Sequence, residues 1–146
     1  MADIPDEHLT EELLDRLLAS ASIEQYLDEG LVSARTLTDY LFDRMEAHDL
    51  RRADVVRASG LNATVVYDIF SGKSRPGRDH AIMLAFGLKC TLRETQRLLR
   101  LAGVSELWCK QRRDAIIIWC IRNGFDRIAT DDELYRMGEA TLLPAD

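Results

Sequence analysis

LRRADVVRASGLNATVVYDIFSGKSRP, residues 50–76, is the stretch that decides the fold, because its apolar residues and glycines mark two short helices and a tight turn. The pattern predicts a first helix over Arg52–Ser59, and Gly60 supplies the left-handed position that ends it. Asn62 is a preferred capping residue for a second helix, which runs to about Ser71. This layout predicts a helix-turn-helix, a motif that places the first turns of its second helix in a DNA major groove.

Outward from this stretch, apolar residues recur at intervals of three and four, and no segment alternates with period two over the length of a strand. We therefore expect an all-α protein. Its centre is a helix-turn-helix domain of five helices over residues 33–103. Residues 1–32 form an N-terminal helical extension, and residues 104–146 form a C-terminal helical extension. Because residues 115–121 are apolar almost all round a helix, this last extension is expected to pack on the core.

Two helix starts follow from local patterns. The first helix of the central domain is expected within residues 33–50, where Leu37, Leu41 and Met45 share a stripe. A capping pattern from Thr130 to Glu133 predicts that the last helix begins there. Acidic residues in such first turns interact favourably with the helix dipole, so we interpret them as capping groups rather than as catalytic acids.

The composition limits the class of protein. With 146 residues and 47% apolar content, the chain can form one domain with a core. No run of about 18 apolar residues suits a membrane span, and the N-terminus lacks the basic and apolar regions of a secretory signal, so we expect a cytoplasmic protein with no membrane partner. Cys90, Cys109 and Cys120 lack C-x-x-C spacing, and we expect buried thiols rather than disulfides or a zinc site.

Charge is divided unevenly along the chain. The formal net charge is −6, which by itself argues against a nucleic-acid partner. Residues 1–43 carry 2 basic and 11 acidic groups, residues 44–127 carry 16 and 9, and residues 128–146 carry 1 and 5. A basic centre between acidic ends fits a DNA-contacting middle domain, and charges on solvated helices are the alternative explanation.

The segment GLNATVVYDIFSGKSRP followed by LAFGL resembles the lambda-repressor-like, XRE-type helix-turn-helix domain, over residues 36–103. The longer string YDIFSGKSRPGRDHAIMLAFGL, then LRETQRLLRLAG, RRDAIIIWCIRNG and ELYRMG, is similar to a bacterial subfamily of such regulators that has extra C-terminal helices. Members of this subfamily sometimes stand beside serine/threonine kinase genes. The resemblance therefore implies a transcriptional regulator in a signalling context.

The resemblance also implies roles for individual residues. The base-facing positions of the recognition helix fall on Ala63, Thr64, Tyr67 and Asp68. None of them offers the bidentate contact that Arg, Gln or Asn makes with a base. The positions that grip phosphates fall on both sides of these: Arg51, Arg52, Asn62, Lys73, Ser74, Arg75 and Arg78. These residue types therefore favour affinity for DNA in general more than preference for a particular base sequence.

Other chemistry has little support in the sequence. Gly72, Lys73 and Ser74 match the end of a phosphate-binding loop, but Tyr67 stands where that motif needs a glycine. The three histidines lie at no metal-ligand spacing, and no nucleophile stands beside a base. We expect no enzyme, cofactor or metal.

The leading hypothesis is a regulator that binds double-stranded DNA in the major groove, as a homodimer on two half-sites. The apolar helix Ala115–Ile121 is the candidate dimer surface, since Ile117 and Trp119 are apolar residues beyond those that a helix with one buried face requires. The alternative is a protein-interaction module, with a kinase or another regulatory protein as its partner, on a scaffold that no longer reads bases.

Overall fold

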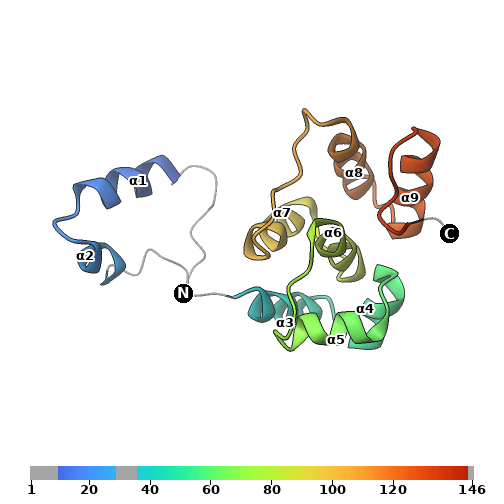
Figure 1. Cartoon of the computed structure of the whole chain (residues 1–146), viewed down its shortest axis with the longest axis horizontal. Helices are drawn as coiled ribbons and strands as arrows, with labels where there is room; N and C mark the ends of the chain where they lie inside the picture. Colours follow the sequence, from blue (N-terminus) through green and yellow to red (C-terminus); the bar gives the residue numbers. More distant parts are fainter. Residues whose placement is uncertain (1–9, 29–35, 145–146) are drawn as a thin grey trace. The chain divides into compact units, whose positions relative to one another are not determined.

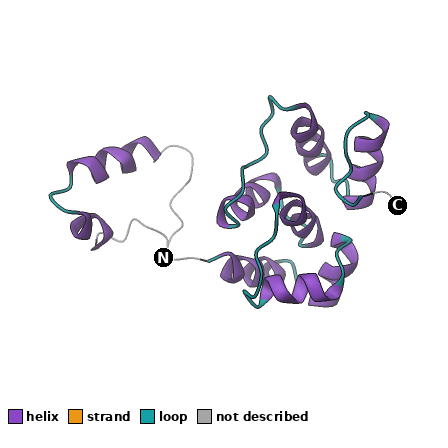
Figure 2. Ribbon diagram, in the orientation of Figure 1, coloured by secondary structure: helices purple, strands orange, loops and turns teal. Residues whose placement is uncertain are grey.

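The computed structural model describes residues 10–28 and 36–144, and all regular secondary structure in these ranges is helical (Figures 1 and 2). The predicted all-α class is therefore confirmed for this part of the chain. The chain divides into two compact units, Met1–Arg35 and Thr36–Asp146, and each is described by itself.

The first unit contains two helices, α1 (Thr10–Ala19) and α2 (Ile23–Asp28). Local hydrogen bonds cap the start of α2: the Ser22 hydroxyl accepts from the Gln25 N–H at 3.1 Å, and the Gln25 side chain accepts from the Ala21 N–H at 3.0 Å. These bonds satisfy backbone donors that the first turn of a helix leaves free.

The second unit begins with five helices joined by short connections: α3 (Leu37–Ala47), α4 (Arg52–Ser59), α5 (Ala63–Phe70), α6 (Arg78–Gly87) and α7 (Leu92–Leu101). α6 lies at the centre of this unit, beside α4, α7 and α9 (Figure 1). Its residues 81–85 are all buried, which explains why this segment is apolar without a polar stripe. The core closes around it with fully buried side chains such as Leu41, Val55 and Leu98.

Two further helices, α8 (Arg112–Arg122) and α9 (Arg127–Arg136), belong to the same unit. Ile117 and Leu134 are fully buried in the common core, and Leu142 of the C-terminal segment joins them. The buried position of Ile117 contradicts the expectation that it is surplus to the core. Trp119, by contrast, is 55% exposed.

α3 begins at Leu37, within the expected range, because Thr36 and Asp39 form a capping box there; residues 33–35 lie outside the described residues. Two other local predictions need correction. α9 begins at Arg127 rather than near Thr130, because the Asp126 carboxylate accepts from the Ala129 N–H at 2.8 Å and caps the helix earlier. Of the three thiols, Cys109 is exposed, since it lies on the connection before α8, whereas Cys120 is buried and Cys90 half-buried.

The early start of α9 determines the position of Asp131. This residue is buried inside α9 instead of lying in its first turn. Its carboxylate accepts from the Leu142 N–H at 2.6 Å and from the Leu143 N–H at 3.2 Å, and it pairs with Arg127 at 2.8 Å. Asp131 therefore fastens the C-terminal segment to α9 and is not a helix cap.

Candidate nucleic-acid interface

The turn between α4 and α5 is held by local hydrogen bonds. Gly60 has φ of +82°, and its N–H donates to the Val56 carbonyl at 3.3 Å. The buried Ser59 hydroxyl accepts from the Leu61 N–H at 3.2 Å. Asn62 then caps α5, with its side-chain oxygen accepting from the Val65 N–H at 2.9 Å. The glycine and the asparagine thus occupy the positions that their conformational preferences predict.

Core packing decides which face of α5 reaches solvent. Val66, Ile69 and Phe70 are buried, and the Phe70 ring meets that of Phe42 edge-on, with ring centroids 5.2 Å apart. The opposite side of the helix is therefore left exposed, and it is the side that carries the candidate base-facing residues.

Three of these four residues, Ala63, Thr64 and Tyr67, are exposed. Asp68 is half-buried, and its main-chain carbonyl accepts from the Lys73 N–H at 2.9 Å and the Ser74 N–H at 3.2 Å. This carbonyl therefore folds the segment after α5 back against the helix. The structure brings the four residues together on the first two turns of α5.

A contact between α4 and α5 places a basic side chain beside the exposed face of α5. The Arg52 guanidinium lies over the Tyr67 ring, 5.2 Å from its centroid. A cation in this position is attracted to the negative face of the ring. The sequence predicts separate roles for Arg52 and Tyr67, since nothing in the spacing of the two residues shows that α4 and α5 bring them together.

Other candidate phosphate-binding residues are also exposed. Arg51 precedes α4, while Lys73 and Ser74 follow α5. Arg75 is exposed as well, and its guanidinium is 3.5 Å from the carbonyl of Leu101, the last residue of α7. A cation is favourable at that helix end, where the carbonyl groups carry partial negative charge.

Arg78 differs from the other candidates because its guanidinium is used inside the protein. Its Nη1 and Nη2 donate to the two carboxylate oxygens of Asp114 at 3.0 and 2.7 Å. Its Nε and Nη2 also donate to the carbonyls of Ser105 and Glu106, at 3.0 and 2.9 Å. These bonds occupy its donors, so we remove Arg78 from the phosphate-binding set.

Acidic groups limit how basic this surface is. On α4, the Asp54 carboxylate pairs with Arg57 and accepts from the Arg51 N–H at 3.0 Å. That backbone hydrogen bond holds the pKa of Asp54 below its ordinary value, so the group is ionised at neutral pH. Asp54 therefore offsets the charge of Arg57, and the usable positive charge lies with Arg51, Arg52 and Lys73.

Potential metal ligands do not cluster in the described part of the chain. No group of three His, Cys, Asp or Glu side chains gathers there as metal ligands. His48 is instead bonded to Glu94, with Nε2 and Oε1 3.3 Å apart, and Glu94 also pairs with Arg44. No helix among the described residues is long and apolar enough to cross a membrane.

Comparison with known proteins leaves the family of the chain open. The chain matches no protein-family model, no curated protein and no solved structure.

Proposed function

We propose that this protein is a DNA-binding regulator built on a lambda-repressor-like five-helix domain, and that α5 enters the major groove of double-stranded DNA. One observation carries the proposal: α4, the Gly60 turn and α5 leave the first turns of α5 exposed, with basic residues on either side. Insertion of the second helix of such a pair is the usual docking mode of this motif.

The proposed contacts divide into two classes. Arg51, Arg52, Lys73 and Ser74 contact phosphates and set the register of the protein on the duplex. Thr64 and Tyr67 lie where the base edges pass. A threonine can hydrogen-bond a base or contact a thymine methyl, but neither residue makes a bidentate contact, so we expect moderate sequence preference.

Alanine substitution of Arg52 or Lys73 tests the phosphate contacts. Each variant is expected to weaken binding of a labelled genomic duplex about equally for all sequences, and to reduce the slope of log affinity against log salt by about 1. Fluorescence anisotropy at several salt concentrations measures both quantities. Arg122→Ala, which removes an exposed cation at the end of α8, is the matched control and should leave the slope unchanged. Binding that is undetectable, or that does not vary with salt, would overturn the proposal.

The second candidate function is a protein-interaction module, with a kinase or another regulatory protein as the partner. The specific observation in its favour is that the exposed face of α5 offers Thr64, Tyr67 and Asp68 in place of strong base readers. Affinity capture from lysate treated with nuclease separates the two functions, because partners bridged by DNA are lost while direct partners remain.

We also propose that the regulator acts as a homodimer through α8 and α9. The exposed Trp119 ring packs edge-on against Phe125, with centroids 5.3 Å apart, and borders a groove of about 300 Å³ that includes Ile116 and Met137. A second copy would cover this apolar surface and place two recognition helices on two half-sites.

The substitution Trp119→Asp tests this surface. Because Trp119 is 55% exposed, the protomer is expected to stay folded while its sedimentation changes from that of a dimer to that of a monomer. Trp108→Asp is the control, since Trp108 is 59% exposed and lies on the connection before α8. A Trp119→Asp protein that sediments like the unsubstituted chain would place the dimer contact elsewhere.

A further inference from the structure

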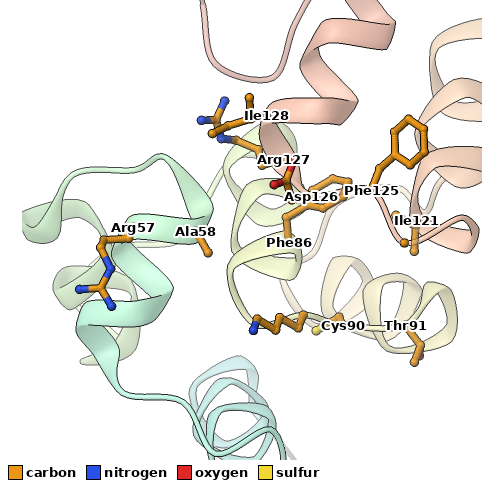
Figure 3. A pocket seen from close by; sticks show the side chains of 12 residues that line it. Arg57, Ala58, Phe86, Cys90, Thr91, Ile121, Phe125, Asp126, Arg127 and Ile128 are labelled. Carbon is orange, nitrogen blue, oxygen red and sulfur yellow. The ribbon is translucent and has the colours of Figure 1, made fainter.

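The second unit contains a cavity of about 480 Å³ that no part of the proposed DNA contact uses (Figure 3). Its walls come from three places: the end of α4, the junction of α6 and α7, and the connection between α8 and α9. This volume lies within the range of roughly 300–1,000 Å³ that is typical of small-molecule sites.

One part of the cavity is apolar. Phe86 projects from the end of α6 toward the connection that carries Phe125, and Ile121 lies beside that connection (Figure 3). The Phe86 ring in this position favours a flat apolar ligand, which it can meet edge-on or with an offset stack. Cys90 also lines the cavity, and burial raises the pKa of its thiol to about 12, so the thiol adds no negative charge at neutral pH.

The charged groups on the lining are mostly cationic. Arg57 is paired with Asp54, and Arg127 with Asp131, whereas the exposed Lys89 makes no close ion pair with the described residues and only helps to lower the pKa of Asp54. The single acidic group on the lining, Asp126, is engaged in capping α9. Lys89 is therefore the cation left to meet an anionic ligand.

We propose that this cavity binds a small aromatic carboxylate, whose ring packs against the Phe86 side chain and whose carboxylate pairs with Lys89. The apolar wall disfavours a highly charged ligand such as a nucleotide, because most of its phosphate oxygens would lose water without gaining donors. A neutral aromatic compound would make no charge-assisted hydrogen bond with Lys89. A monoanion with an aromatic body satisfies both parts of the lining.

The position of the cavity ties its occupant to the first helix of the motif. Arg57 and Ala58 belong to α4. The Arg127 side chain, on the opposite wall, lies against the turn: a Cβ built at Gly60 would come within 2.6 Å of Arg127 Nε. A ligand here would touch both α4 and the group that packs on the turn.

Binding of 1-naphthoate to the full chain, measured by isothermal titration calorimetry without DNA, tests the site. We expect saturable binding with one site per chain. The uncharged analogue 1-naphthalenemethanol should bind about two- to fivefold more weakly, since it lacks the charge-assisted bond to Lys89. Lys89→Met should weaken naphthoate binding by about two- to fivefold and leave the analogue unaffected.

Two further variants serve as a control and as a test of the apolar wall. Lys73→Met removes an exposed lysine from the segment after α5 and should bind naphthoate like the unsubstituted chain. Phe86→Leu should weaken both probes, because it removes the ring but not the charge. No saturable binding, equal affinity for the two probes, or equal effects of the two lysine substitutions would each overturn the inference. Because no DNA is present, failure here is distinct from failure of the proposed DNA binding.

Discussion

Replacing Asp114 with alanine is expected to lower the free energy of unfolding by about 3 kcal/mol, because it breaks a buried ion pair and leaves the other charge without its partner. The Asp114 side chain is 2% exposed, and Arg78 is 25% exposed. Besides the two bonds from Arg78, the carboxylate accepts from the Trp108 N–H at 2.9 Å. One carboxylate thus joins α6, the connection before α8, and α8 itself.

Chemical denaturation of Asp114→Ala and Asp79→Ala measures this effect against a matched control. Asp79 also joins α6 to α8, through Arg113 at 2.8 Å, but its side chain is 42% exposed. Its loss should therefore cost about 1 kcal/mol or less. Equal losses for the two variants would show that burial of the Arg78–Asp114 pair is not what makes it important.

The pH dependence of the same pair has a definite sign. Burial by itself would raise the pKa of Asp114, but the hydrogen bonds from Arg78 and from the Trp108 N–H outweigh it and hold the pKa below its ordinary value. Such a group stabilises the folded state above its unfolded pKa of about 3.9, and this stabilisation is lost as pH falls through the folded pKa. The difference in stability between the unsubstituted chain and Asp114→Ala should be full at pH 7 and shrink below about pH 4.

The second large effect is expected for Gly87→Ala, at the crossing of α4 and α6. A Cβ at this position would lie 2.8 Å from the Val55 carbonyl oxygen and 2.9 Å from the Ser59 Cβ. In an unhindered helix, alanine is about 1 kcal/mol more favourable than glycine. Here the substitution must push the two helices apart, and we expect a net loss of about 2 kcal/mol.

Thermal denaturation monitored by circular dichroism measures this loss. Gly77→Ala is the control, because nothing lies within 4 Å of a Cβ built at Gly77 and its φ is −70°. The control should leave the melting temperature almost unchanged, whereas Gly87→Ala should lower it by several degrees. A higher melting temperature for Gly87→Ala would contradict this prediction, because it would mean that α4 and α6 have room for the added methyl group.

The helices, and the exposed face of α5, follow from local sequence rules. Gly60 and Asn62 mark the turn because left-handed backbone and side-chain capping depend on single residues. The spacing of Val66, Ile69 and Phe70 is enough to show which side of α5 is buried. The late start predicted for α9 is wrong because Asp126 and Thr130 are both residues that can cap a helix, and Asp126 is the one that does so.

Contacts between distant residues could not be predicted in this way. Arg78 and Asp114 are 36 positions apart. An arginine after a recognition helix gives no sign that its partner lies in a later helix. The cation–π contact of Arg52 with Tyr67 likewise depends on the crossing of two helices. The helix that carries a cationic side chain can therefore be predicted from the sequence, whereas the partner of that side chain can be found only from the tertiary structure.

Selection of bound sequences from a random duplex library, carried out with the full chain at two salt concentrations, tests the central claim most directly. The account predicts enrichment of a sequence with two half-sites about one helical turn apart, and a steep loss of binding at the higher salt concentration. Recovery of no enriched sequence and no bound duplex at the lower concentration would contradict it.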